Sequence, residues 1–297
     1  MLLEHIIMFY KIAAEKSISK VAQSNHISQP ALSQQMQRLE EELDVKLLER
    51  SNRGIELTPA GKIFQKYAVQ FMGLYSDLKE ELDNLHTGNN TFHVAATPVA
   101  CNYALPCSLY KVNQRFPHYT FRLSGEPSSS VIRQVLDDRT DLGFIVGAVD
   151  LPELTCKAVY QDKIHLIVRS SYPIEPRITL KELERCPLIL LNESFSSYRL
   201  VCNYLKQLGY PISSCRVMYH LDSTESVKSA VQAGHGAAFL PYIAVKKELY
   251  LNQLKSIEIE GFDLDYGVYS IHKNTAADPE INEIIDYFVK NVGETLC

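Results

Sequence analysis

The sequence predicts a mixed fold in which a small helical domain, a long helix and a larger α/β domain follow one another. Three observations predict it. Apolar residues recur at helical spacing through roughly the first 85 residues, and from Thr91 short strands alternate with helices. The length of 297 residues is also enough for two or three domains, each with a core of its own.

Charge and cysteine content exclude several classes of protein. The chain has 30 Lys and Arg against 35 Asp and Glu, so it is neither a polybasic coat protein nor an acidic disordered chain. Residues 1–62 hold eight basic and eight acidic residues, so a nucleic-acid partner would have to be recognised by local geometry. The seven cysteines form no CxxC pair, no apolar run could span a membrane, and the amino terminus lacks the basic segment of a signal peptide. We therefore expect a cytoplasmic protein.

Three short helices are predicted at the amino terminus, over residues 3–15, 19–24 and 28–43. A tight turn at 25–27 separates the second from the third. Ser28 is a good N-cap, and Pro30 falls in the first turn, where its missing N–H costs nothing. The third helix has a buried stripe formed by Leu32, Met36, Leu39 and Leu43.

The opposite face of the third helix is polar and uncharged. It presents Pro30, Ser33, Gln34 and Gln37, and no carboxylate occurs between Ser28 and Arg38. Amide and hydroxyl groups suit contact with DNA base edges, because Gln pairs with adenine and Ser can donate or accept. An ordinary solvated face of a small helical domain is the alternative, and this helix alone does not separate the two.

Residues 46–50 and 55–58 are predicted to form two short strands around a turn that contains Gly54. Arg50 and Arg53 then lie where the hairpin of a winged domain would meet phosphates. Such contacts position a protein on DNA without recognising its sequence.

The spacing QPALSQQMQRLEEELDVKLLER…GIELTPAGK closely resembles the winged helix-turn-helix of LysR-type transcriptional regulators over residues 1 to about 90. Leu48 stands where the family usually has Phe, and Asp44-Val45 where it commonly has Leu-Gly, which leaves the geometry of that turn open. The resemblance implies binding to a pseudo-palindromic site on double-stranded DNA. The DNA-binding residues that it implies are Ser28, Gln29, Pro30, Ser33, Gln34, Gln37, Arg38, Arg50 and Arg53.

A long helix is predicted to begin at Thr58-Pro59 by a cap and a first-turn proline. Its apolar residues repeat with heptad spacing, interrupted by Glu81, and they are Phe64, Tyr67, Phe71, Leu74, Leu78 and Leu85. Such a stripe needs a partner helix, so we expect a homodimer through this segment. The resemblance further implies a homotetramer.

Strands alternate with helices from Thr91 onward, which predicts parallel sheets with helices on both faces. The predicted strands are 91–96, 120–124, 142–146, 163–168, 187–191, 237–240 and 266–271. The predicted helices are 103–116, 128–138, 180–184, 198–208, 224–233 and 279–292. About 200 residues is large for one such sheet, so two lobes are expected.

The order of these elements resembles the two-lobed effector-binding domain of the same regulators, which is similar to the periplasmic binding-protein fold. The resemblance implies a winged helix-turn-helix over 1–58, a linker and dimerisation helix over 59–90, and an effector-binding domain over 91–297. Lobe I would be about 91–161 and 269–297, and lobe II about 162–268.

In open α/β sheets, ligands bind at the carboxyl ends of strands and near helix N-termini. Hydroxyl and amide groups at such ends predict a site for a small effector, either an anion or a polar metabolite. Val99 and Ala100 replace polar residues of the sulfate-binding, sulfur-assimilation branch that AATPVACNYALP resembles, so a partly apolar metabolite fits at least as well as a bare oxyanion. Each Ser or Thr could instead only cap its helix. The candidates are Thr97, Ala100, Ser128, Ser129, Ser130, Asn192, Ser223 and Thr224.

Two other hypotheses remain open. A redox-sensing regulator would use cysteines, and the candidates are Cys101, Cys107, Cys202 and Cys215, although free cysteines are more often small buried hydrophobes. A two-lobed solute-binding protein or enzyme would leave the first 90 residues unexplained. The sequence has no HExxH, GxSxG or phosphate-binding glycine loop and no metal-ligand spacing of histidines, so we expect no catalytic residue, no cofactor and no metal.

Overall fold

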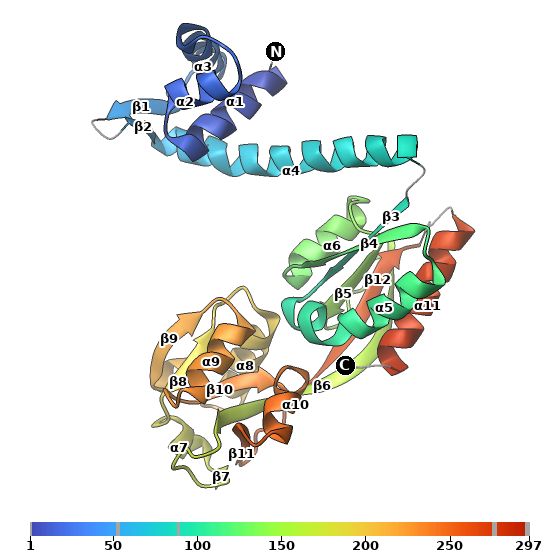
Figure 1. Ribbon diagram of the computed structural model, residues 1–297. Coiled ribbons are helices and arrows are strands. Elements are labelled where there is room, and N and C mark those ends of the chain that lie inside the picture. The colour runs from blue at the N-terminus through green and yellow to red at the C-terminus, as the bar shows by residue number, and fades with distance from the viewer. Residues whose placement is uncertain (1, 52–53, 88–89, 275–277, 295–297) are drawn as a thin grey trace. The chain divides into compact units, whose positions relative to one another are not determined.

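The structure is a computed structural model that describes residues 2–51, 54–87, 90–274 and 278–294. The chain folds into two compact units, Met1–Gly88 and Asn89–Cys297 (Figure 1). None of the helices in the described ranges combines the length and the apolar content that a membrane span requires.

The amino-terminal unit begins with three helices, α1 (Leu2–Glu15), α2 (Ile18–Ser24) and α3 (Gln29–Leu43). All three were predicted. Ser28 caps α3 as expected, since its Oγ accepts a hydrogen bond from the N–H of Ala31 at 3.3 Å. The three helices bury one apolar core, which includes Phe9, Ile12, Val21, Leu32, Met36 and Leu39.

The carboxyl end of α3 differs from the expectation in one respect. Leu43 was predicted to be buried, but it is 40% exposed, because the helix ends there and its last turn extends beyond the core. Asp44 closes the helix with a φ of 51° and a ψ of 35°. Asp is among the few residues that adopt this left-handed conformation at small cost, so Asp44 performs the role that glycine commonly has at this position.

Glu40 is the buried charge of this unit. Glu40 is 8% exposed, and its Oε1 accepts hydrogen bonds from the N–H groups of Leu47 and Leu48 at 2.8 and 3.0 Å. Oε2 pairs with Nζ of Lys46 at 2.7 Å. Burial would raise the pKa of this carboxyl, but the hydrogen bonds from Lys46 and the two backbone N–H groups outweigh burial and lower it. Glu40 thereby joins the end of α3 to the segment that follows.

That segment is the predicted hairpin, in which β1 (Leu48–Ser51) pairs antiparallel with β2 (Gly54–Leu57). The long helix α4 (Pro59–Thr87) follows. Thr58 Oγ1 donates to the carbonyl of Lys46 at 2.6 Å and accepts from the N–H of Gly61 at 2.9 Å. A Cβ on Gly61 would lie 2.1 Å from the carbonyl oxygen of Leu47, so only glycine allows α4 to pack this closely on the hairpin.

The second unit is a two-lobed α/β domain built on a mixed sheet, in the order β4-β3-β5-β12-β6-β11-β7 with β10 also paired to β6. The expectation of parallel sheets is wrong for the centre of this sheet. Only β3–β4, β3–β5 and β11–β7 are parallel, whereas β12 and β6 run antiparallel to their neighbours. The strands are β3 (Asn90–Ala96), β4 (Tyr119–Gly125), β5 (Leu142–Val146), β6 (Leu154–Arg169), β7 (Arg177–Ile178), β10 (Ala238–Pro241), β11 (Leu254–Ile259) and β12 (Asp265–Lys273).

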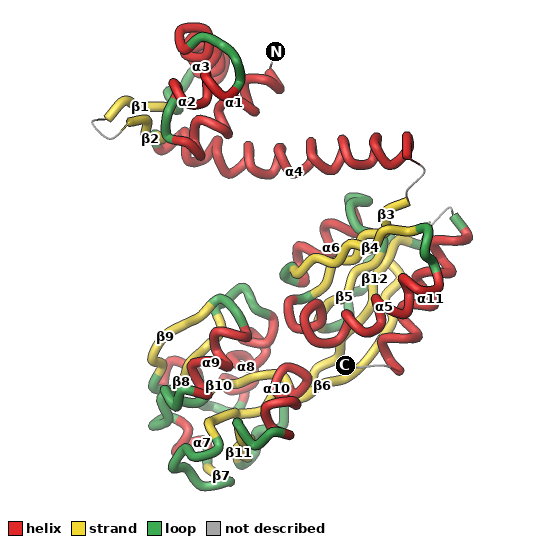
Figure 2. Tube along the Cα trace, viewed as in Figure 1, coloured by secondary structure: helices red, strands yellow, loops and turns green. Residues whose placement is uncertain are grey.

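Helices cover both faces of the strands in lobe I (Figure 2). Alternating side chains of the sheet serve the two sides: Ala95 and Ile145 pack with Val131 of α6, whereas Val94 and Phe144 share a core with α5 and α11. The helices are η1 (Ala100–Ala104, a π-helical turn), α5 (Leu105–Arg115), α6 (Ser128–Leu136) and α11 (Pro279–Glu294).

Strands β6 and β12 connect the lobes. The first part of β6, Leu154–Lys163, pairs with β12, and its last residues pair with β10 and β11, so one continuous strand serves both lobes. The sequence predicts this strand only from Lys163 and does not predict β7, β9, β11 or α10. The remaining elements are α7 (Leu180–Leu183), β8 (Leu188–Leu191), α8 (Ser196–Gln207), η2 (Ile212–Ser214), β9 (Val217–Leu221, parallel to β8), α9 (Thr224–Gln232) and α10 (Tyr242–Tyr250).

We predict that Glu40→Ala destabilises the amino-terminal unit by about 2–3 kcal/mol, because two backbone N–H groups lose a charged acceptor. Urea unfolding followed by circular dichroism measures this, with the exposed Glu42→Ala as the control. The pKa of Glu40 is lowered by folding, so the wild-type contribution is present above the unfolded pKa of about 4.3 and is lost as the pH falls through the folded value. Equal stability of the two variants at pH 7 would contradict the role given to Glu40.

Candidate DNA interface and ligand pocket

The polar face of α3 is open to solvent. Ser28, Pro30, Gln34 and Gln37 are exposed, and Ser33 is half-buried, whereas the apolar residues of the opposite stripe form the core. The amides of Gln34 and Gln37 are therefore not used as hydrogen-bond partners for buried groups of the protein interior. They are presented on a capped helix whose other side is held by packing.

The other predicted DNA-binding residues fall into three groups. Gln29 and Arg38 are exposed, and Oε1 of Gln29 accepts a hydrogen bond from the hydroxyl of Ser19 on α2 at 3.0 Å. The backbone of Arg50 lies in β1, opposite Ile55. Arg53 lies outside the described residues. The structure thus places seven of the nine predicted side chains, those of Ser28 through Arg38, on one helix and its cap.

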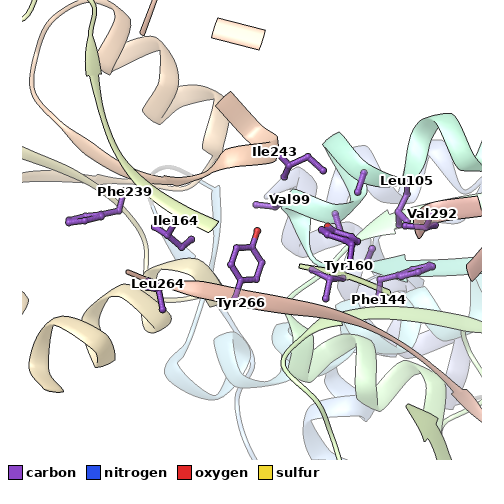
Figure 3. Close-up of a cluster of buried hydrophobic side chains, with 14 of the residues drawn as sticks. Val99, Leu105, Phe144, Tyr160, Ile164, Phe239, Ile243, Leu264, Tyr266 and Val292 are labelled. Atoms are coloured by element: carbon purple, nitrogen blue, oxygen red, sulfur yellow. The ribbon is translucent and has the colours of Figure 1, made fainter. Parts of the chain in front are cut away.

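A narrow pocket with a free volume of about 20 Å³ lies within the α/β domain, where the segment before η1 faces the start of α8. Tyr160 of β6 and Tyr266 of β12 also line it, so both connecting strands contribute. Figure 3 shows Tyr266 with Val99 on one side and with the apolar side chains of Ile164 and Leu264 on the other. The described lining is uncharged, and it consists of Thr97, Pro98, Val99, Ala100, Val146, Tyr160, Phe195, Ser196, Ser197, Pro241, Tyr266 and Val268.

Three hydroxyl groups in this pocket lack partners. The oxygens of Thr97, Tyr160 and Ser197 are buried and, among the described residues, have no hydrogen-bond partner. A buried hydroxyl without a partner costs free energy, and native proteins keep few of them. Three such groups on the wall of one cavity indicate a site whose hydrogen bonds are completed by a bound molecule or by water.

The structure brings only part of the predicted effector set to this pocket. Thr97 and Ala100 line it, and Ser128 reaches its edge, where its Oγ lies 3.3 Å from Oγ of Ser196. Ser129 is exposed, and Ser130 accepts a hydrogen bond from Gln134 instead.

In lobe II, none of the three predicted residues is among the lining residues. Asn192 accepts from the N–H of Ser194 at 3.0 Å, Ser223 caps α9 through the N–H of Ser226, and Thr224 is buried in the first turn of α9. For Asn192 and Ser223 these local hydrogen bonds account for the side chain.

Four pocket residues are not among those predicted from the sequence: Ser196, Ser197, Tyr160 and Tyr266. The predicted helix began at Tyr198, two residues too late, because Phe195 at the N-cap offers no side-chain hydrogen bond and so leaves no capping signal. The Ser-Phe-Ser-Ser run after the buried strand β8 was the available signal, of the same kind as the one used for Ser128. The two tyrosines lie inside strands that reach the pocket only through the tertiary fold.

A polar cluster supports the pocket from the connecting strands. The hydroxyl of Tyr266 donates to Oδ2 of Asp162 at 2.9 Å, and the same oxygen accepts from the N–H of Ile243 on α10 at 3.3 Å. Burial raises the pKa of Asp162 despite these bonds, and burial together with the Asp162 charge raises the pKa of Tyr266. Asp162 therefore links β6, β12 and α10 directly behind the pocket.

A second cluster connects η1 to the opposite lobe. The hydroxyl of Tyr103 donates to Glu225 of α9, and the ammonium of Lys228 lies 5.0 Å from the centre of the Tyr103 ring. Lys228 is only 6% exposed and pairs with Glu225 at 2.9 Å and with Glu248 at 3.0 Å. Because Tyr103 follows the pocket residues Thr97 and Ala100 so closely, the position of this contact is tied to the shape of the pocket.

Three of the four cysteines of the redox hypothesis, Cys101, Cys202 and Cys215, have free thiols that give it little support, whereas the fourth, Cys107, is disulfide-bonded. Burial raises the pKa values of Cys101, Cys186, Cys202 and Cys215, so these groups stay protonated at neutral pH. A sensing thiol needs the opposite shift.

Both parts of the chain match family models. Residues 3–62 match the bacterial regulatory helix-turn-helix protein, lysR family, and residues 86–293 match the LysR substrate binding domain. A relative from Cyanidioschyzon merolae, described as a probable RuBisCO transcriptional regulator, is 31% identical over 275 residues and covers 91% of each chain.

Solved structures show the same fold. The crystal structure of CbnR, a LysR family transcriptional regulator, matches 99% of this chain and 100% of its own with a TM-score of 0.72 at 20% identity. Full-length CbnR complexed with its target DNA matches 98% of this chain and 100% of its own with a TM-score of 0.71. With a capped helix-turn-helix, a hairpin, a long helix and a two-lobed α/β domain in this order, the chain belongs to the LysR family of transcriptional regulators.

Proposed function

We propose that this regulator binds a pseudo-palindromic DNA site through the polar face of α3 and that a small effector in the α/β domain controls it. The observation that carries the DNA assignment is that Gln34 and Gln37 are exposed on a helix that is otherwise fixed by its core. Base edges are contacted by Ser33, Gln34 and Gln37, and Pro30 packs nearby. The DNA backbone is held by Ser28, Gln29, Arg38, Arg50 and Arg53. The chain has no catalytic role in this proposal, and it acts in the cytoplasm.

Helix α4 supplies the dimer contact. Its large apolar side chains repeat at intervals of three or four residues and are 36–64% exposed; they are Ile63, Tyr67, Phe71, Leu74, Leu78 and Leu82. Such a stripe is stable in water when a second copy covers it. Phe64 does not belong to the stripe, because its ring packs edge-on against Phe9 with the centroids 4.8 Å apart.

The effector is a small, partly apolar molecule that accepts hydrogen bonds. The lining of the pocket offers apolar walls and three unpartnered hydroxyls, and the N-terminus of α8 faces it through Ser196 and Ser197. A carboxylate fits such a site, since helix N-termini and hydroxyls both favour an anion. A ligand that bridges Thr97 and Ser197 would shift the balance of arrangements through the Tyr103–Glu225 contact, because it binds one arrangement better than the other.

We predict that Gln34→Ala weakens binding to the operator about tenfold and leaves non-specific binding unchanged, because a base contact is lost and phosphate contacts remain. Fluorescence anisotropy with the chain's own promoter region and with a scrambled duplex measures both. Gln23→Ala, at an exposed position of α2 outside the proposed face, is the control. Absence of sequence-selective binding by the wild type would overturn the assignment.

Leu74→Glu is expected to convert the dimer formed through α4 into monomers and to weaken operator binding at least tenfold, because a carboxylate would be buried in the helix pair. Sedimentation velocity gives the oligomeric state at matched concentrations. Ser76→Glu, at an exposed position on the side of α4 opposite the stripe, should leave the dimer intact. A dimer that survives Leu74→Glu unchanged would rule out this contact.

Thr97→Val should leave the melting temperature of the unliganded chain unchanged or raised, since the hydroxyl that it removes has no partner. The control Thr58→Val alters an equally buried threonine that makes two hydrogen bonds, and it should cost about 1–2 kcal/mol. Differential scanning fluorimetry compares the two. In a screen of small carboxylates, any compound that stabilises the wild type should lose its effect on Thr97→Val. A strong destabilisation by Thr97→Val would show that the hydroxyl serves the fold.

A further inference from the structure

Two glutamines on the exposed face of α3 differ in how their amides are held. Gln34 makes no hydrogen bond with another described residue, so its amide can present either its oxygen or its nitrogen. Gln37 is bound to Glu41, one turn further along the helix, through Nε2 and Oε1 at 2.8 Å. Both residues are exposed, and the regular helix from Gln29 to Leu43 keeps them at this spacing.

The chemistry of this pair fixes the orientation of the Gln37 amide. An ionised carboxylate only accepts hydrogen bonds, so Gln37 has to offer Glu41 an N–H group. The amide oxygen of Gln37 then points away from Glu41 and remains available as an acceptor. Neighbouring carboxylates do not interfere, since Glu40 is engaged with Lys46 and the hairpin backbone, and Glu42 lies about 100° further around the helix.

An outward acceptor favours particular bases in the major groove. Adenine and cytosine present amino groups there, at N6 and N4, whereas guanine and thymine present the acceptors O6 and O4 at the corresponding positions. We propose that Glu41 is a positioning residue that holds the Gln37 amide with its oxygen outward, so that Gln37 selects an amino-bearing base, adenine or cytosine, at one position of each half-site. This inference rests on the proposed DNA contact of α3.

The pair also explains why an acidic residue is compatible with a DNA-binding helix. A carboxylate near phosphates is repelled, yet Glu41 stands one turn beyond the last polar residue of the face and directs its charge to Gln37. Its effect is on which base is chosen and not on the overall attraction to DNA. Removal of the Glu41 charge and removal of the Glu42 charge should therefore have the same effect on DNA affinity. Only removal of the Glu41 charge should change the base preference.

The experiment measures base preference with the full chain and a library of its own operator in which each base pair is varied in turn. Gln37→Ala identifies the contacted position as the one where preference is lost. We expect the wild type to favour adenine or cytosine over guanine and thymine there by about tenfold. In Glu41→Gln the new amide can donate as well as accept, so the Gln37 amide can flip, and the preference at this position should fall to less than about threefold.

Glu42→Gln is the matched control, because it removes the same charge from a neighbouring exposed position and leaves the Gln37–Glu41 pair intact. It should keep the wild-type preference and share any gain in affinity seen with Glu41→Gln. Three results would overturn the proposal: a preference for guanine or thymine at the Gln37 position, equal preferences in the two variants, or no position affected by Gln37→Ala. A wild type that binds no operator would instead refute the DNA contact of α3 itself.

Discussion

The arrangement of the amino-terminal unit depends on one buried carboxylate. Glu40 accepts hydrogen bonds from the backbone of Leu47 and Leu48, the first residues of the hairpin segment, while it belongs to the last turn of α3. Apolar packing fixes the helix on the core side, but packing alone does not determine how the chain leaves a helix. The buried Glu40 carboxylate needs hydrogen-bond donors, and binding to those of Leu47 and Leu48 sets the direction in which the chain leaves α3. The ion pair with Glu40 also holds Lys46 beside this carboxylate.

Sequence was sufficient for features whose cause is local. The cap at Ser28, the hairpin around Gly54 and the exposed amides of α3 all follow from residues within a few positions of one another. Thr97 was found because the end of a strand is visible in sequence. Leu43 was placed wrongly, since helical periodicity continues past the point where the core ends.

The pocket could be predicted only in part, because it is assembled from strands far apart in the chain. Tyr160 and Tyr266 lie about 100 residues apart and meet because β6 and β12 are antiparallel partners, a pairing that the expectation of parallel sheets did not include. The acidic and aromatic contacts around Lys228 likewise join η1, α9 and α10. No local sequence pattern predicts such contacts between distant segments.

The pairing of β6 with β12 has a mechanical consequence. A β-bulge bends its strand and increases the local twist, and here the register between β6 and β12 shifts between Val268 and Tyr269. Val268 also lines the pocket. The irregularity in the strand pair that joins the two lobes therefore lies on the cavity wall, so a molecule bound in the pocket would contact β12 at its bend.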